Sequence, residues 1–436
     1  MNAAVLSVSR GIARVTGAAL GQYQTAVIRI GFSATWLLFL LRELPHRNEL
    51  YGPDGPWSHD LAEQLLSDNG AFTALMWSDG RAWFEIVYAV AVLSSVLLLL
   101  GWRTRTMSVL FMIGVLSLQN RSVFMGDGGD NVVHLMSIYL VLTRCGRVWS
   151  LDARRARRAA AARARGERVE DRVGPVLWCA LGFLLLTVTL AGGLDGDWFV
   201  PALLWAVWIA LGLWWAVGRG GEGSQPRILL DVVTSIVHNG ALVVIMAEAC
   251  LIYATAGWYK IQGSRWQDGT AVYYPLHLDY FSPWPALSDA LAASGTMVML
   301  ITYGTVAVQV AFPFTLFNRR VKNVLLAAMM IEHAVIAVTL GLPFFSLAMI
   351  AADAVFLPTS FLRRLGGWAA RARGRLFGRG PSGGLAKAPD GGGRGDGSGR
   401  TATVPGPRAR EAGGPVAGTG AVDGKDADPT HVGFRA

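Results

Sequence analysis

The sequence predicts an all-α, polytopic transmembrane helical bundle of about ten spans, and three observations support this fold class. First, 53% of the 436 residues are hydrophobic and only 16% are charged. Second, apolar runs of about 17–25 residues recur along the chain, each long enough to cross a hydrocarbon layer of about 30 Å. Third, Arg residues cluster between apolar runs, as expected for loops on the cytoplasmic side. The net charge of +9 is thus explained by topology, and nucleic acid is not an expected partner.

The expected spans follow the apolar runs in order. They cover 24–42, 83–101, 106–124, 131–148, 174–192, 200–217, 232–256, 287–312, 323–341 and 344–361. With the N-terminus inside, the predicted cytoplasmic segments carry 25 Lys and Arg, whereas the outer loops carry six. Because basic residues are enriched in cytoplasmic loops, both termini are predicted to be cytoplasmic, in a multi-pass protein of the plasma membrane.

The segments around the spans divide the chain further. We expect a transmembrane domain over 24–361, in which 174–217 form two extra spans. The other segments are a cytoplasmic or interfacial N-terminus (1–23), an outer loop with a short helix at 59–67 (43–82), a basic cytoplasmic linker (150–173), an outer aromatic loop (257–286) and a basic, then Gly- and Pro-rich, disordered tail (362–436). The linker is either a helix lying on anionic lipid or only a topology signal.

Several classes of function lack their motifs. The three cysteines, Cys145, Cys179 and Cys250, show no CxxC spacing, so a disulfide framework or thiolate metal site is not expected. No HxxxH, HExxH or HxxHH pattern occurs, and no metal is predicted. Neither GxSxG nor a phosphate-binding loop is present, so hydrolase and nucleotidase functions have no support.

Ionisable residues within spans are costly, so each is a candidate functional position. They are Arg29, Glu85, His134, Asp231, His238, Glu248, Glu332, His333 and Asp353. Glu248 lies about 18 Å along a helix from Lys260, so it is expected to form hydrogen bonds inside the bundle instead. Arg29 is expected to pair with Glu248, Glu332 or Asp353, and the sequence does not choose among them.

Lys260 follows the predicted span 232–256, where the apolar run meets the membrane surface. Desolvation there disfavours a charged amine, and a neutral amine could deprotonate a lipid-soluble substrate. Alternatively, Lys260 extends its charge into the lipid headgroups. The aromatic residues of 257–286 also have two interpretations, an interfacial belt and an entrance suited to a quinone ring.

Asp130 and His134 lie at the predicted outer start of the span 131–148, on the same side of the membrane as Lys260. They are four residues apart and share one helix face. Asp130 either caps the helix, after Gly128 and Gly129, or orients the His134 imidazole for acid–base work. Taken alone, His134 is expected to be a structural, hydrogen-bonding histidine.

These stretches resemble a known family, the vitamin K-dependent γ-carboxylases and their bacterial relatives, which share a horizontally transferred transmembrane (HTTM) domain. The similar segments are Ala256-Gly257-Trp258-Tyr259-Lys260 with Trp266, Asn131-Val132-Val133-His134 with Trp149-Ser150-Leu151-Asp152, and Glu332-His333 through Leu340–Ser346. The resemblance covers about residues 24–360 apart from 174–217.

The resemblance implies a site and a chemistry. Lys260 would deprotonate reduced vitamin K or menaquinone, which then reacts with oxygen; the resulting strong base removes a glutamate γ-proton, and carbon dioxide adds. His134 would assist at the carbanion, with Asp130, Asn131, Tyr259 and Trp266 in supporting positions. The substrate would be a secreted peptide, although the chain has no folded extracellular region after the spans to hold one. Two other functions stay open: a non-enzymatic membrane protein that assists maturation or export of a secreted peptide, and a proton-coupled transporter.

Overall fold

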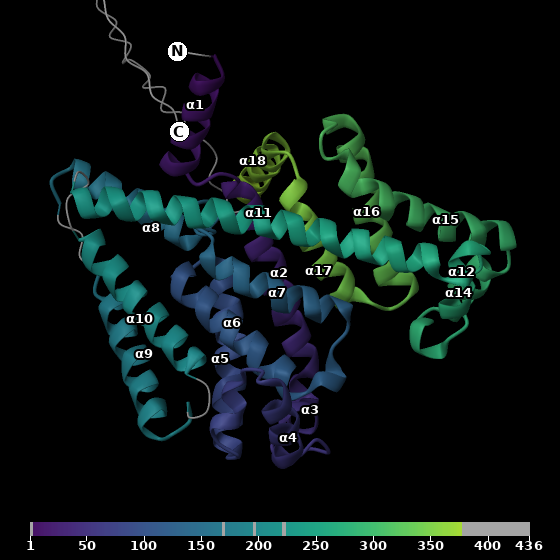
Figure 1. The fold of residues 1–436 in the computed structure, drawn as a ribbon, viewed down its shortest axis with the longest axis horizontal. Helices are drawn as coiled ribbons and strands as arrows, with labels where there is room; N and C mark the ends of the chain where they lie inside the picture. Colours follow the sequence, from purple (N-terminus) through teal and green to yellow (C-terminus); the bar gives the residue numbers. More distant parts are fainter. Residues whose placement is uncertain (1–2, 168–170, 195–197, 220–223, 377–436) are drawn as a thin grey trace, which may run out of the picture. The chain divides into compact units, whose positions relative to one another are not determined.

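The computed structural model describes residues 3–167, 171–194, 198–219 and 224–376 (Figure 1). These residues form helices and connecting loops, with no β-strand among them, so the predicted all-α class is confirmed. The part of the predicted tail beyond residue 376 lies outside the described residues.

Seven helical segments are long and apolar enough to cross a membrane, and an eighth is added if one bent helix pair counts as a span. The seven are Gln22–Tyr51, which joins α2 (Gln22–Glu43), η1 (Leu44–His46) and α3 (Arg47–Tyr51); α5 (Arg81–Leu100); α9 (Val173–Leu190); α10 (Phe199–Gly218); α11 (Gln225–Gln262); Gly295–Thr315, which joins α15 (Gly295–Ala311) and η5 (Phe312–Thr315); and α16 (Arg319–Thr339). A multi-pass membrane protein is therefore compatible with the fold.

Two predicted spans form helices that fall short of this test. Helix α6 (Thr104–Arg121) fills most of 106–124, but its first and last turns carry basic and amide side chains. Helix α7 (Gly128–Leu142) ends before the predicted 148, and its 15 residues reach only about 22 Å. It stops because the next residues turn toward α11, where the Arg144 N–H donates to Nδ1 of His238 at 2.8 Å.

Two further predicted spans are broken. Residues 287–312 divide into α14 (Pro285–Ala292) and α15, separated by Ser294, whose side chain caps α15. Residues 344–361 begin as α17 (Pro343–Asp353) and η6 (Ala354–Phe356), then bend by 117° into α18 (Thr359–Leu376). Pro358 lies at this bend and contributes to it, because proline disfavours the helical conformation in the residue before it. The first residues of the predicted tail therefore continue a helix.

Helix α2 lies at the centre of the core. It packs against α5 and α17, while α5 packs on α6, α6 on α7, and α7 on α17 and α11 (Figure 1). Ile28, Phe32, Trp36 and Leu40 of α2 are fully buried in these contacts. These four side chains lie within the candidate span Gln22–Tyr51, where close interdigitation rather than burial from water holds spanning helices together.

The longest helix, α11, has 38 residues and a length of about 57 Å, more than the predicted 232–256. Its N-terminal half binds the end of α1 (Ala3–Gly17) and the turn that follows. The Asn239 amide donates to the carbonyls of Val15 and Ala18 and accepts from the Leu20 N–H. The predicted interfacial segment is therefore helical and attached to α11.

Helices α9 and α10 form a hairpin in the region of the two extra spans. Trp178 and Trp208 stack with ring centroids 4.2 Å apart, and each indole N–H donates to the other residue's carbonyl. This reciprocal pair fixes the hairpin.

Shorter helices occupy the connecting segments. They are α4 (His59–Asn69) and η2 (Ala74–Trp77) in the outer loop, where α4 confirms the short helix predicted at 59–67; η3 (Val123–Met125); α8 (Leu151–Ala164) in the basic linker; and α12 (Ser264–Gln267), α13 (Tyr273–Leu276) and η4 (Asp279–Phe281) in the aromatic loop. The buried Arg121 anchors the loop 43–82 by donating to the carbonyls of Gly52 and Trp57.

Candidate functional site

Lys260 lies in the last turn of helix α11, and so is helical where the sequence predicted a loop. The helix continues past residue 256 until Gly263, whose N–H bonds to the carbonyls of Tyr259 and Lys260. Three residues before Lys260, α11 approaches α15 closely. A Cβ atom at Gly257 would lie 2.6 Å from Cγ2 of Val310. Glycine therefore permits the approach that places Lys260 beside α15.

The amine of Lys260 belongs to a chain of three polar side chains on three helices. Its Nζ donates to Oε1 of Gln309 at 2.7 Å, and Nε2 of Gln309 donates to Oε1 of Glu332, also at 2.7 Å. Gln309 is 5% exposed, whereas Lys260 and Glu332 are half-buried. The direct partner of the amine is thus a neutral amide, and the carboxylate is one residue further away. This arrangement does not fix the amine as a contact ion pair.

An aromatic side chain covers the same amine. Gly263 ends α11 and the short helix α12 follows, so Trp266 returns toward Lys260, with its ring centroid 5.2 Å from Nζ. This is within cation–π range. Around it Trp258, Tyr259, Tyr273 and Tyr274 are exposed.

A second polar cluster lies deeper, on the neighbouring turns of α11, α16 and α17. The Tyr253 hydroxyl is 3.1 Å from Nε2 of His333, and Tyr253 also interacts electrostatically with Asp353. His333 is 2% exposed and Asp353 is fully buried. Within the described part of the chain, Nδ1 of His333 forms no hydrogen bond, and the Asp353 carboxyl group has the Tyr253 hydroxyl nearby but no hydrogen bond of good geometry. Buried polar atoms of this kind are costly, and they mark functional positions in membrane helices.

His134 lies on α7, and its side-chain hydrogen-bond partner is not Asp130, the residue considered from the sequence. Asp127 is the N-cap of α7, and Asp130 completes a capping box by accepting from the Asp127 N–H. The imidazole instead meets Gln119 of α6, whose Oε1 is 3.1 Å from Nδ1, while Nε2 of Gln119 donates to the Asp130 carbonyl. Because Gln119 presents its oxygen, Nδ1 of a neutral His134 carries the proton and Nε2 is left as an acceptor. The capping interpretation of Asp130 agrees with this geometry, and Asn131 is exposed beside it.

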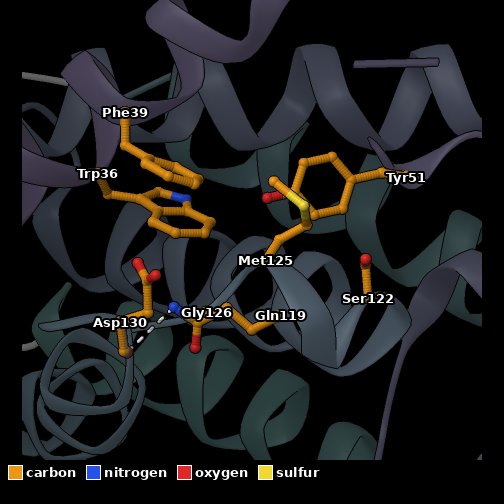
Figure 2. A pocket seen from close by; sticks show the side chains of 8 residues that line it. All are labelled: Trp36, Phe39, Tyr51, Gln119, Ser122, Met125, Gly126 and Asp130. Atoms are coloured by element: carbon orange, nitrogen blue, oxygen red, sulfur yellow. Dashed lines mark hydrogen bonds between the residues drawn. The ribbon is translucent and has the colours of Figure 1, made fainter. Parts of the chain in front are cut away.

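A small hollow opens next to Gln119 and Asp130 (Figure 2). It is lined by Trp36, Phe39, Tyr51, Gln119, Ser122, Met125, Gly126 and Asp130. Its volume of about 10 Å³ accepts a single water molecule and is far below the size of a quinone ring.

The structure connects some of the predicted residues and separates others. Lys260 and Glu332 share Gln309, whereas His134 has its own partner on α6. Phe345 lies between the two regions, because its ring is 5.5 Å from that of His333 and its backbone packs against Gly129, one turn before His134.

Two other candidates have structural roles. Arg29 is fully buried and donates to the carbonyls of Leu98, Leu99 and Trp149, so the expected pairing with a carboxylate does not occur. These carbonyls lie at the C-terminal end of α5 and the turn before α8, where a cation is favourable. Glu248 accepts a 3.4 Å hydrogen bond from the Tyr139 hydroxyl within the bundle, as the sequence predicted.

Sequence reasoning missed Gln309, Gln119 and Tyr253, which connect the candidates. Gln309 had a recognisable signal, since it is the one amide in the apolar run Val306–Ala311. Gln119 and Tyr253 had no comparable signal, because their roles depend on which helices pack together.

Comparison of the chain with known protein families, with curated proteins and with solved structures found no match. Among the described residues, no group of three His, Cys, Asp or Glu side chains could hold a metal ion.

Proposed function

We propose that this chain is a membrane protein of the vitamin K-dependent γ-carboxylase type, in which Lys260 accepts a proton from a reduced quinone at the outer membrane surface. One observation carries the proposal: the Lys260 amine is held by the neutral Gln309, with Glu332 behind the amide and Trp266 over the amine. The proposal includes ten membrane crossings with both termini cytoplasmic, supported by the distribution of basic residues along the sequence.

The residues near Lys260 fit a quinone. Trp266 offers an aromatic face at the amine, and two further aromatic side chains of the last turns of α11, Trp258 and Tyr259, are exposed. A bound reduced naphthoquinone would supply an acidic hydroxyl group and reactivity toward oxygen. Gln309 would orient the amine for the proton, and Glu332 would balance the charge that the amine gains. His134, with Nε2 unprotonated, would serve a secreted peptide substrate as acid or base.

The test is oxygen-dependent epoxide formation from reduced menaquinone or vitamin K, with purified protein in nanodiscs. Wild type would be compared with Lys260→Met and His134→Ala. Lys322→Met is the matched control, because Lys322 lies in the first turn of α16 and donates to the Phe356 carbonyl of η6 instead of joining the site. We expect epoxide from wild type and Lys322→Met but not from Lys260→Met. Absence of epoxide from folded wild type would refute the proposal for these quinones.

A second function, proton-coupled transport, is favoured by a separate observation. Broken helices are typical of transporters, and the segment Pro343–Phe356, which contains the buried Asp353, meets α18 at 117°. We propose as the alternative that His333, Tyr253 and Asp353 form part of a proton path. Proton uptake into proteoliposomes that is abolished in Asp353→Asn would favour transport, and uptake that is unchanged would exclude this path.

A further inference from the structure

Three arginines gather around one tryptophan where several long helices end. Arg105 is in the first turn of α6, Arg144 and Arg147 follow α7, and Trp214 is in the last turns of α10. The Cζ atom of Arg105 is 3.1 Å from the Trp214 ring centroid and that of Arg144 is 5.7 Å away. Arg147 interacts electrostatically with Arg144. The three positive charges therefore share one small region.

Among the residues that the structure describes, one acidic residue forms an ion pair within this arginine cluster. Arg144 donates to Asp231 at 2.8 Å and to Ser235 at 3.1 Å, both on α11. The Arg105 guanidinium has no hydrogen-bond acceptor among the described residues, and its close partner is the indole ring. Like charges held together repel one another, and a guanidinium presents five donors in a planar fork. The cluster is thus short of negative charge and of acceptor atoms.

The surroundings of the cluster select the kind of anion. Leu213, adjacent to Trp214 on α10, is 59% exposed, and Ile228, three residues before Asp231 on the same face of α11, is 46% exposed. Apolar surface therefore continues from the arginines along α10 and α11. A free phosphate would leave this surface uncovered, whereas a phospholipid would cover it with acyl chains while its phosphate accepts from the arginines.

We propose that Arg105, Arg144 and Arg147 form a binding site for the phosphate headgroup of an anionic phospholipid, with Trp214 as its aromatic wall. The lipid also joins the α9–α10 hairpin to the bundle, because Trp214 belongs to α10 and the arginines to α6 and the turn after α7. This site is independent of the proposed reaction at Lys260.

The test is native mass spectrometry of the purified full chain in detergent, titrated with phosphatidylglycerol and with phosphatidylcholine of the same acyl chains. We expect phosphatidylglycerol to bind preferentially, and its affinity to fall roughly five- to tenfold in Arg105→Gln and in Arg147→Gln. Arg158→Gln on α8, an exposed arginine outside the cluster, is the matched control and should bind as wild type does. Asp231→Asn should strengthen binding, since it removes the acid that pairs with Arg144.

Three results would overturn the proposal. They are equal binding of phosphatidylcholine, equal weakening by Arg158→Gln, and competition by glycerol 3-phosphate as strong as that by the lipid, which would identify a site for free phosphate. If Arg105→Gln does not fold, Arg147→Gln still tests the proposal, because Arg147 is exposed and its replacement should leave the fold intact.

Discussion

Replacing Gln309 tests the arrangement around Lys260 without knowledge of the substrate. In Gln309→Leu, two hydrogen bonds to charged groups are lost, each worth about 1.5–3 kcal/mol. The free energy of unfolding should therefore fall by roughly 3–6 kcal/mol. In Gln309→Glu, a carboxylate replaces the amide oxygen 2.7 Å from the amine. A contact ion pair then holds the amine in its charged form, and the fraction of neutral amine should fall roughly 10- to 1000-fold.

The assay is competitive acylation of lysines at fixed pH, read by mass spectrometry, because only a neutral amine reacts. Lys387 and Lys425 serve as internal references in the same chain. We expect Gln309→Glu to remain folded but to lose labelling at Lys260 and, with it, epoxide formation. Unchanged labelling of Lys260 in Gln309→Glu, in protein that remains folded, would refute the role assigned to the amide.

Three other predictions concern contacts between separate segments of the fold. Gly257→Ala should destabilise the protein by about 1–3 kcal/mol in thermal unfolding, because its methyl group would overlap a methyl group of α15. Gly240→Ala on the same helix meets no atom within 4 Å and should be neutral or stabilising, so equal losses would contradict the close approach. Arg29→Met should cost about 3 kcal/mol or more in denaturant unfolding, since three buried carbonyls lose a charged donor, and a loss below 1 kcal/mol would rule out this role. Finally, the Arg103 guanidinium lowers the pKa of Asp171, in the linker between α8 and α9, to about 2. The ion pair should therefore stabilise the fold above pH of about 4 and lose this effect as the pH falls toward 2. The stabilisation should be less than about 1 kcal/mol, because Asp171 is partly exposed. Asp171→Asn should thus lower the melting temperature slightly at pH 7 and less at pH 3, and a difference that grows at pH 3 would contradict this sign.

The sequence predicted the helices well because apolar runs are local properties. Every predicted span coincides with at least one helix, and α4 was anticipated within the outer loop. Helix ends were less predictable, since they depend on distant partners. Helix α7 stops near Arg144, whose N–H bonds to His238 about 90 residues later, and no local signal at Leu142 reveals that contact.

The candidate site was predictable only in its charged members. Lys260, Glu332, His333 and Asp353 attract notice because ionisable side chains are rare in spans. Gln309 carries no charge, so a search for ionisable groups passes over it, although it provides the hydrogen bonds between two of them. The true partners of Arg29 are backbone carbonyls, which every residue possesses, and sequence contains no information that selects them.

The two proposed functions make different demands on the same helices. If Lys260 acts in catalysis, the proton that Lys260 accepts need only return to the nearby surface. Asp353 would then be dispensable for epoxide formation. Transport requires a continuous route across the membrane, of which Tyr253, His333 and Asp353 would form part. Asp353 interacts with Tyr253 of α11, whereas Lys260 lies in the last turn of that helix, seven residues further on, so the two groups lie at different levels along α11. A variant of Asp353 that keeps quinone turnover but loses proton movement would show that the deeper cluster has a function of its own.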